Sequence, residues 1–379
     1  MTMRRTWPAS AAIIAGLLLS GCTGSAETPA TTTTPTTLPP SPSATPIEQV
    51  QPAGTPTVPA SGLRAPWSVV RLPDGSALIS ERDTAIIKEL TDSGELRDAG
   101  TIAGVTPGGE GGLLGIEMRD AEDGLWLYAY FTAASDNRIV RMQIEGETGA
   151  LELVGASVVV SGIAKARNHN GGRIKFGPDG MLYATVGDAG NPALAQDPTS
   201  LNGKILRMAP DGSVPDDNPT PGSLVYTLGH RNPQGLAWDS TGQLWASEFG
   251  QNTWDELNII KAGNNYGWPT VEGAGGVAGF TDPAHQWSTA EASPSGLAII
   301  NDTLFMATLR GQTLWAIYPT DGRADAVSWY RTEYGRLRDA IPGPDGSLWV
   351  LTNNTDGRGN PAQDDDKLMQ IRLTPLTEG

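Results

Sequence analysis

Cysteine is nearly absent from this chain. The only one in 379 residues is Cys22, so a disulfide framework is excluded. Histidine is also rare, with three in all. Acidic residues outnumber basic ones, with 42 Asp and Glu and 26 Lys and Arg. The resulting net charge of −16 disfavours nucleic acid and anionic membranes as electrostatic partners. No window has a capped helical stripe, and no apolar run reaches the ~20 residues that span a bilayer.

Glycine and proline are plentiful, at 47 and 29 residues, while charged residues make up only 18%. This balance favours short strands and turns over long, charged helices. The 39% of hydrophobic residues is enough for one large domain or two ordinary ones. An all-β protein is therefore the first expectation.

The N-terminus is predicted to carry targeting and linker sequence. Two arginines precede a short apolar run that ends in Leu19-Ser20-Gly21-Cys22, a pattern typical of a bacterial lipoprotein signal cleaved before a lipidated cysteine. An ordinary signal peptide with an incidental cysteine is the alternative. The segment that follows is rich in Thr, Pro and Ser, which indicates an extended linker. The expected divisions are a signal peptide at 1–21, a linker with lipidated Cys22 at 22–60 and a domain at 61–379 outside the cytoplasm, with the lipid as its membrane anchor.

A hairpin pattern recurs six times, at 63–82, 112–131, 170–190, 232–250, 293–311 and 337–354. Each copy has an apolar strand, a turn resembling Pro-Asp-Gly and a second apolar strand. One hairpin cannot bury both of its faces, so neighbours must stack, and radially stacked sheets form a propeller. Further strand-like runs between the copies supply four strands per unit. The sequence thus predicts an all-β, six-bladed β-propeller with four-stranded antiparallel blades; a pair of β-sandwiches is the alternative.

Two polar residues flank the third hairpin. His169 stands at its start and Asp188 at its end, and an antiparallel hairpin brings these two positions together at the rim of the central channel. A carboxylate beside an imidazole fixes the ring tautomer and raises its basicity, which suits a general base. A structural histidine is the alternative interpretation.

Arginines stand at matching rim positions of other repeats. They are Arg231, Arg310, Arg336 and Arg338. Guanidinium groups that point at one channel would repel one another, so a polyanionic ligand is their natural partner. Salt bridges to Asp339 or Glu333 are the alternative. After the fourth hairpin, the loop from 250 to 266 offers Asp255, Glu256 and free carbonyls, an oxygen-rich set that would suit calcium, although a solvated loop is equally consistent.

Seven motifs occur in order: GGEGGLLG (108–115), NHNGGR (168–173), GDAG (187–190), GHRNPQG (229–235), EFGQNTWDE (248–256), GNNYGWP (263–269) and GRLRD (335–339). Together they resemble the soluble quinoprotein glucose/sorbosone dehydrogenases, also called aldose sugar dehydrogenases. Members of that family are six-bladed propellers that use pyrroloquinoline quinone (PQQ) and calcium. The resemblance extends from about residue 61 to 375.

The resemblance implies roles for individual residues. His169 would take the proton from the anomeric hydroxyl of an aldose, oriented by Asp188, while hydride passes to the quinone and a lactone forms. The implied cofactor contacts are Glu110, His169, Arg231, Asn232, Arg310, Arg336 and Arg338. Calcium would take the carbonyls of Gly250 and Gln251, and further family calcium positions match Glu256 and Tyr266.

The chain departs from the familiar pattern at three of these positions. Glutamine is usual in place of Glu110, lysine in place of Arg310 and proline in place of Gln251. A carboxylate at 110 beside an anionic cofactor is unfavourable unless a cation or a proton compensates it. The long insertion that shapes the dimer and sugar pocket in glucose dehydrogenases is absent, which predicts a monomer with an open pocket.

Electrons are expected to leave to an external acceptor, such as a quinone, a cytochrome or a dye. Two other functions remain open. A calcium-dependent lactonase-type hydrolase would have no use for four arginines. A non-catalytic propeller that binds a polyanion or a protein would not need the pair of His169 and Asp188.

Overall fold

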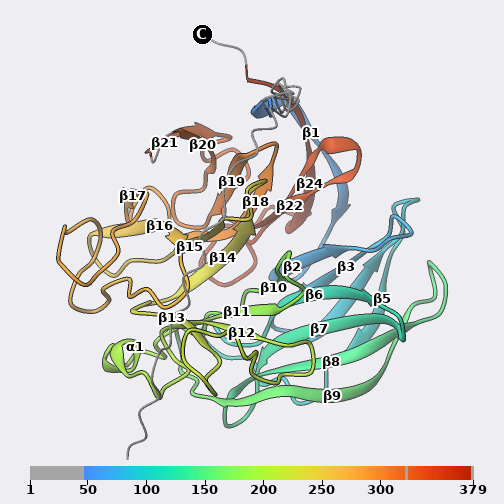
Figure 1. Cartoon of the computed structure of the whole chain (residues 1–379). Helices are drawn as coiled ribbons and strands as arrows, with labels where there is room; N and C mark the ends of the chain where they lie inside the picture. The colour runs from blue at the N-terminus through green and yellow to red at the C-terminus, as the bar shows by residue number, and fades with distance from the viewer. Residues whose placement is uncertain (1–46, 321–322, 377–379) are drawn as a thin grey trace, which may run out of the picture. The chain divides into compact units, whose positions relative to one another are not determined.

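The computed structural model describes residues 47–320 and 323–376. The signal peptide, Cys22 and most of the predicted linker lie outside the described residues. The strands form six four-stranded antiparallel sheets, which confirms the predicted six-bladed β-propeller (Figure 1). Among the described residues, no helix has the length and apolar character needed to cross a membrane.

The blades follow one another along the chain. Blade 1 is β2 (Pro66–Arg71), β3 (Ala77–Glu81), β4 (Ile86–Leu90) and β5 (Leu96–Thr101), and blade 2 is β6 (Leu113–Ala121), β7 (Gly124–Thr132), β8 (Asn137–Glu145) and β9 (Glu152–Ile163). Blade 3 is β10 (Ile174–Phe176), β11 (Leu182–Val186), β12 (Lys204–Met208) and β13 (Val225–Leu228), and blade 4 is β14 (Pro233–Trp238), β15 (Leu244–Glu248), β16 (Trp254–Ile260) and β17 (His285–Ser288). Blade 5 is β18 (Pro294–Ile300), β19 (Thr303–Thr308), β20 (Leu314–Thr320) and β21 (Arg323–Trp329), and blade 6 is β22 (Leu337–Pro342), β23 (Leu348–Thr352), β24 (Lys367–Pro375) and β1 (Val50–Ser61). Short helical turns lie at α1 (Ala193–Gln196) and η1 (Pro344–Gly346).

Turn chemistry explains the predicted hairpins. Asp74 accepts hydrogen bonds from the main-chain N–H and the hydroxyl of Ser76, at 3.0 and 2.6 Å, between β2 and β3. Asp239 does the same for Thr241 between β14 and β15. An aspartate that satisfies the backbone two residues later stabilises a tight turn. The flanking apolar strands are therefore forced into antiparallel pairs.

The buried apolar residues lie between neighbouring blades. One cluster joins Leu78 of blade 1 to Leu127 of blade 2, and another joins Ile79 of blade 1 to Trp349 of blade 6. Because a sheet buries its faces only against its neighbours, these clusters close the ring.

The first strand corrects the predicted linker at its C-terminal end. Residues 50–61 form β1, which pairs with β24 as the outer strand of blade 6. Prolines are tolerated in an outer strand because a missing N–H can face away from the sheet. The pairing register runs from Val50 opposite Pro375 to Ser61 opposite Lys367. Since the partner strand lies at the other end of the chain, the local pattern could not reveal this pairing.

The predicted site residues lie at equivalent ends of strands. Positions just before an inner strand hold Glu110, His169, Arg231, Asn232 and Arg336, and positions just after a second strand hold Asp188 and Arg310. Arg338 lies in β22 itself. Inner-strand starts and second-strand ends share one face of a propeller, so this face carries the candidate site.

Candidate active site

His169 and Asp188 form a hydrogen-bonded pair. The His169 Nδ1 lies 2.7 Å from Asp188 Oδ1, and Asp188 also accepts hydrogen bonds from the main-chain N–H of Gly190 at 2.8 Å and the indole N–H of Trp268 at 2.9 Å. Burial opposes ionisation of Asp188, but these hydrogen bonds and the neighbouring His169 outweigh it and lower the pKa of Asp188. An ionised carboxylate holds the Nδ1 proton in place. The Nε2 atom of His169 has no hydrogen-bond partner among the described residues, and the side chain is 13% exposed.

The His169 backbone has a positive φ of 58°, which is uncommon for a residue with a side chain. Its main-chain N–H donates to Glu110 Oε2 at 2.9 Å. Behind it, a Cβ added at Gly187 would lie only 2.2 Å from the His169 carbonyl oxygen. The loop therefore needs glycine at 187 to bring His169 against the end of β11.

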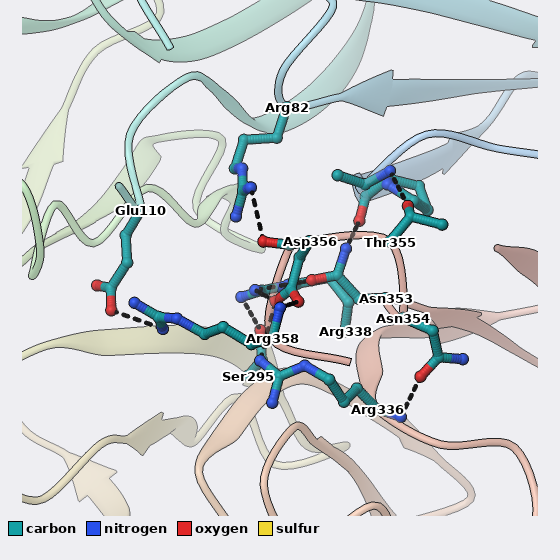
Figure 2. Close-up of polar contacts among 12 residues, drawn as sticks. Arg82, Glu110, Ser295, Arg336, Arg338, Asn353, Asn354, Thr355, Asp356 and Arg358 are labelled. Carbon is teal, nitrogen blue, oxygen red and sulfur yellow. Dashed lines mark hydrogen bonds and ion pairs between the residues drawn. The ribbon is translucent and has the colours of Figure 1, made fainter. Parts of the chain in front are cut away.

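Arginines gather around one carboxylate on this face (Figure 2). Arg336 Nη2 donates to Asp356 Oδ2 at 2.9 Å, and Arg82 Nη2 donates to the Asp356 main-chain oxygen at 3.2 Å. Arg338 lies 4.0 Å from the same carboxylate. Burial opposes ionisation of Asp356, but the charges of Arg336 and Arg338 outweigh it and lower its pKa. Arg82 also forms an ion pair with Asp83, from Nε at 2.7 Å and from Nη2 at 2.9 Å. Asp83 and Asp356 together cannot neutralise three guanidinium groups, so the cluster keeps a positive excess of one charge.

Arg338 is the most enclosed member of the cluster. Its Nη1 donates to Gln234 Oε1 at 2.8 Å, and its Nε and Nη2 donate to Asn353 Oδ1 at 3.2 and 3.0 Å. Its guanidinium carbon lies 5.7 Å from the ring centroid of Trp67. Burial lowers the pKa of Arg338 to about 9, so the guanidinium group is still protonated at neutral pH. The amide partners thus fix this guanidinium in place without cancelling its charge.

The Nε atoms of Arg231 and Arg336 are buried at this face and have no hydrogen-bond partner among the described residues. Arg231 also donates from Nη1 to the Phe249 carbonyl oxygen at 3.3 Å and packs over Trp268, 5.5 Å from its ring centroid. A buried donor without a partner is costly, and a ligand acceptor is one way to satisfy it.

Two predicted cofactor residues occupy different positions from the cluster. Arg310 is exposed and makes no ion pair or hydrogen bond with the described residues. Asn232 is buried, and its Oδ1 accepts the main-chain N–H of Gly171 at 3.0 Å. The oxygen of Asn232 thus joins the start of blade 4 to the loop that carries His169.

Glu110 is neutralised by a residue that the sequence analysis did not identify. Its Oε1 accepts a hydrogen bond from Arg358 Nη1 at 3.0 Å, and its Oε2 accepts one from the main-chain N–H of His169. Burial opposes ionisation of Glu110, but the His169 N–H and the charge of Arg358 outweigh it and lower its pKa. The cation needed to compensate a carboxylate at position 110 is therefore present in this chain.

Arg82 and Arg358 are candidate functional residues that sequence reasoning missed. A pocket on this face is lined by Trp67, Arg82, Glu110, Gln234, Phe249, Leu309, Arg338 and Arg358. Arg82 directly follows the second strand of the first hairpin, a position that matches Arg310 in the fifth. That equivalence was the available signal for Arg82. Arg358 lies in a long loop after β23 and had no such signal.

The predicted metal residues fall into two groups. The carbonyl oxygens of Gly250 and Gln251 accept no hydrogen bond from the described residues. Glu256 instead accepts from Asn258 Nδ2 at 3.1 Å and the main-chain N–H of Gly273 at 2.7 Å, and the Tyr266 hydroxyl donates to the Ile259 carbonyl at 2.7 Å. Burial, and then the charge of Glu248, raises the pKa of Glu256. Within 47–320 and 323–376, no group of three or more His, Cys, Asp and Glu residues is placed to hold a metal, so a cation here would need main-chain or ligand oxygens.

Known proteins resemble the chain over nearly all of the propeller. The solved structure of the PQQ-bound aldose sugar dehydrogenase from Streptomyces coelicolor is 49% identical, with a TM-score of 0.81, and the match covers 86% of this chain and 100% of that chain. Quinoprotein glucose dehydrogenase B of Acinetobacter calcoaceticus is 32% identical over 58% of this chain and 53% of that protein. Aldose sugar dehydrogenase YliI of Escherichia coli is 33% identical over 50% of this chain and 58% of that protein.

The matches to the last two proteins span only a little over half of their lengths, whereas the family profile covers most of this chain. The profile described as "Glucose / Sorbosone dehydrogenase" matches residues 63–363, a range that includes the pair of His169 and Asp188 and all the clustered arginines. The chain therefore belongs to the glucose/sorbosone dehydrogenase family.

Proposed function

We propose that this protein oxidises aldose sugars to lactones with PQQ and calcium and passes the electrons to an external acceptor. The observation that carries the proposal is the hydrogen-bonded pair of His169 and Asp188 on the same propeller face as unpartnered, buried arginine donors. The similarity to a PQQ-bound aldose sugar dehydrogenase supports the choice of cofactor and substrate.

The arginines fit PQQ because that cofactor carries three carboxylates. The Nε atoms of Arg231 and Arg336 are buried donors that lack an acceptor among the described residues, and the hydrogen bonds of Arg338 go to neutral amides. These three residues would hold the carboxylates and quinone oxygens, with Asn232 beside them and Arg310 free to approach from the rim. Arg82 and Arg358 also line the pocket, where Arg358 is paired with Glu110.

Calcium fits the loop after β15 because hard cations prefer oxygen ligands. The carbonyls of Gly250 and Gln251 accept no hydrogen bond from the part of the chain that the structure describes, so they would bind the ion without breaking one. We also propose Glu256 and Tyr266 for a further calcium position, as the family resemblance implies. Glu256 is buried beside other carboxylates, an arrangement that a cation would relieve.

His169 would act as the general base. Its Nδ1 is committed to Asp188, so Nε2 is the atom free to accept the proton of the anomeric hydroxyl. Asp188 would stabilise the imidazolium that results, and Trp268 would hold Asp188 in place through its indole N–H. PQQ, with calcium as a Lewis acid, would supply the hydride acceptor. The sugar would lose a hydride from its anomeric carbon and a proton from its hydroxyl, which leaves the lactone.

The remaining proposals concern the setting of the reaction. We propose a monomer held outside the cytoplasm by lipid on Cys22, with residues 1–21 removed as a signal peptide. The folded domain would then begin near Val50, with a linker shorter than 22–60. Exchange of Cys22 for alanine should move the protein from the membrane fraction to the soluble one. An unchanged distribution would count against the anchor.

The direct experiment measures dye-linked oxidation of a panel of aldoses by purified apo-protein. Four conditions are needed: no addition, PQQ alone, calcium alone and both together. Activity only with both additions, with lactone as the product, is the expected result. If no aldose is oxidised and PQQ does not bind, the arginines serve another ligand, and the lactonase and binding-protein hypotheses replace this one.

A further inference from the structure

The loop after β15 is organised around a single carboxylate oxygen. Glu272 Oε1 accepts hydrogen bonds from four consecutive main-chain N–H groups: Gln251 at 2.6 Å, Asn252 at 3.0 Å, Thr253 at 3.1 Å and Trp254 at 3.3 Å. The loop thus wraps its donors around an anion supplied by the protein itself.

Peptide geometry then fixes where the carbonyls of the loop point. In a planar trans peptide, the C=O of one residue points opposite to the N–H of the next. The N–H groups of Gln251 and Asn252 point at Glu272, so the carbonyls of Gly250 and Gln251 point away from it. These are the same two oxygens that accept no hydrogen bond from the described residues.

The segment that carries Glu272 is itself anchored to blade 4. The N–H of Gly273 donates to Glu256 Oε1 and the N–H of Ala274 donates to Gln286 Oε1, each at 2.7 Å. A Cβ added at Gly273 would lie 2.4 Å from the Trp254 side chain, so this backbone packs directly on β16. Glu272 therefore acts from a fixed support.

Gly250 is held at the other end of the loop. Its N–H donates to Asp255 Oδ1 at 2.8 Å, and a Cβ added there would lie 1.7 Å from the Trp254 carbonyl oxygen. No larger residue could bring position 250 so close to β16. The loop thus closes tightly between Asp255 and Glu272.

We propose that Glu272 is a positioning residue for calcium: its carboxylate gathers the N–H groups of residues 251–254 and thereby presents the carbonyls of Gly250 and Gln251 to the ion. This inference rests on the proposed function, because that function supplies the calcium. A negative charge at the N–H side of the peptides also polarises them and strengthens the negative end at the carbonyl oxygens. Glu272 would act through the loop, without touching the ion.

The test compares three variants of the full protein with the parent. Glu272→Ala removes the carboxylate, and Glu272→Gln keeps an acceptor oxygen of the same shape without the charge. Asp282→Asn is the matched control, because Asp282 accepts main-chain N–H groups of Gly275 and Gly276 in the same long loop but none from 251–254. Calcium affinity is measured by titration calorimetry with PQQ present, and hydrogen exchange of the amides of 251–254 is measured without calcium.

Loss of an outer-shell partner typically weakens metal binding about 10- to 100-fold. We therefore expect Glu272→Ala to weaken calcium binding at least about tenfold, Glu272→Gln to weaken it less, and Asp282→Asn to leave it unchanged. The amides of 251–254 should exchange faster in Glu272→Ala, while the core strands remain protected.

Three results would overturn the inference. If the parent binds calcium and folded Glu272→Ala binds it equally well, the positioning role is wrong while the proposed function stands. If Glu272→Ala fails to fold, Glu272→Gln decides instead. Unchanged calcium affinity in Glu272→Gln, together with unchanged hydrogen exchange of the amides of 251–254, would also show that the positioning role is wrong. If the parent itself binds no calcium with PQQ present, the proposed function fails and this inference fails with it.

Discussion

The described residues contain two histidine–carboxylate pairs of equal length and opposite surroundings. His169 and Asp188 are 2.7 Å apart, and so are His230 and Glu248. The Nε2 of His230 lies 2.9 Å from the Thr227 hydroxyl, and its ring is fully buried and stacked on Tyr266 with centroids 4.8 Å apart. The Nε2 of His169 has no partner within the described ranges, and its side chain is partly exposed.

The difference shows what makes one pair a candidate base. Both carboxylates fix a ring tautomer, so the pair by itself does not distinguish catalysis from structure. A general base needs a ring nitrogen that can reach the substrate. Of these two rings, only that of His169 has such a nitrogen, its Nε2. The other pair satisfies buried polar groups, as the interior of a protein requires. Single exchanges in and around the two pairs test this division.

Exchange of His169 for alanine should abolish most activity. Loss of a general base costs about 10²- to 10⁴-fold in rate. Because the side chain is partly exposed and lies at the rim, the melting temperature should change little. Steady-state oxidation with saturating PQQ and calcium, beside a thermal melt, measures both quantities. Exchange of His285, the third histidine, is the control and should leave the rate unaltered. A His169→Ala enzyme with near-normal turnover would remove this residue from the mechanism.

Exchange of Asp188 for asparagine should lower the rate on the order of 10²-fold, the lower end of what a general base contributes, because asparagine no longer requires a proton on Nδ1. It should also change the response of stability to pH. The folded pKa of Asp188 is lowered, so its ionised form stabilises the protein above the unfolded value of about 3.9, and that contribution is lost as the pH falls through the folded value.

Urea unfolding at pH 7, 5 and 3 measures this response. The stability gap between the parent and Asp188→Asn should hold from pH 7 to 5 and narrow at pH 3. A gap that widens in acid would mean that the carboxylate does not stabilise the fold in its ionised form.

Exchange of His230 for alanine should act on stability instead of chemistry. It removes the ring that bonds both Glu248 and Thr227 and leaves buried polar atoms without partners. The expected loss is about 2–3 kcal/mol in the free energy of unfolding, with turnover per folded molecule preserved. Denaturant titration and active-site titration with PQQ separate the two effects. A stable variant with lost turnover would reverse the roles assigned to the two histidines.

Exchange of Trp268 for phenylalanine is the mildest change. It removes one hydrogen bond to Asp188, at 2.9 Å, and keeps an aromatic ring under Arg231. The loss of about 1 kcal/mol predicts a few-fold lower rate. Rates of Trp268→Phe and Asp188→Asn, alone and combined, form a double-mutant cycle. Additive effects would show that Trp268 does not act through Asp188.

Local sequence pattern was enough for the fold and for the central pair. Six hairpins at similar spacing could bury their faces only by stacking, and the hairpin between β10 and β11 brings His169 to Asp188 because Ile174 pairs with Ala184. Equivalent positions in the repeats also predicted that Arg231, Arg336 and Arg338 lie on one face. These predictions succeed because each depends on residues within one repeat or on the repetition itself.

Tertiary structure decided the rest, because it joins residues from different blades and from long loops. Arg358 meets Glu110 across 248 positions of the chain, and β1 joins β24 from the opposite end. Glu272 reaches residues 251–254 only because the long connection from β16 to β17 folds back onto the loop after β15. Burial also decided that the Nε2 of His169 is free while the Nε2 of His230 is bonded. A carboxylate beside an imidazole can be inferred from a hairpin, whereas the absence of a partner on the ring's other side depends on everything packed around it.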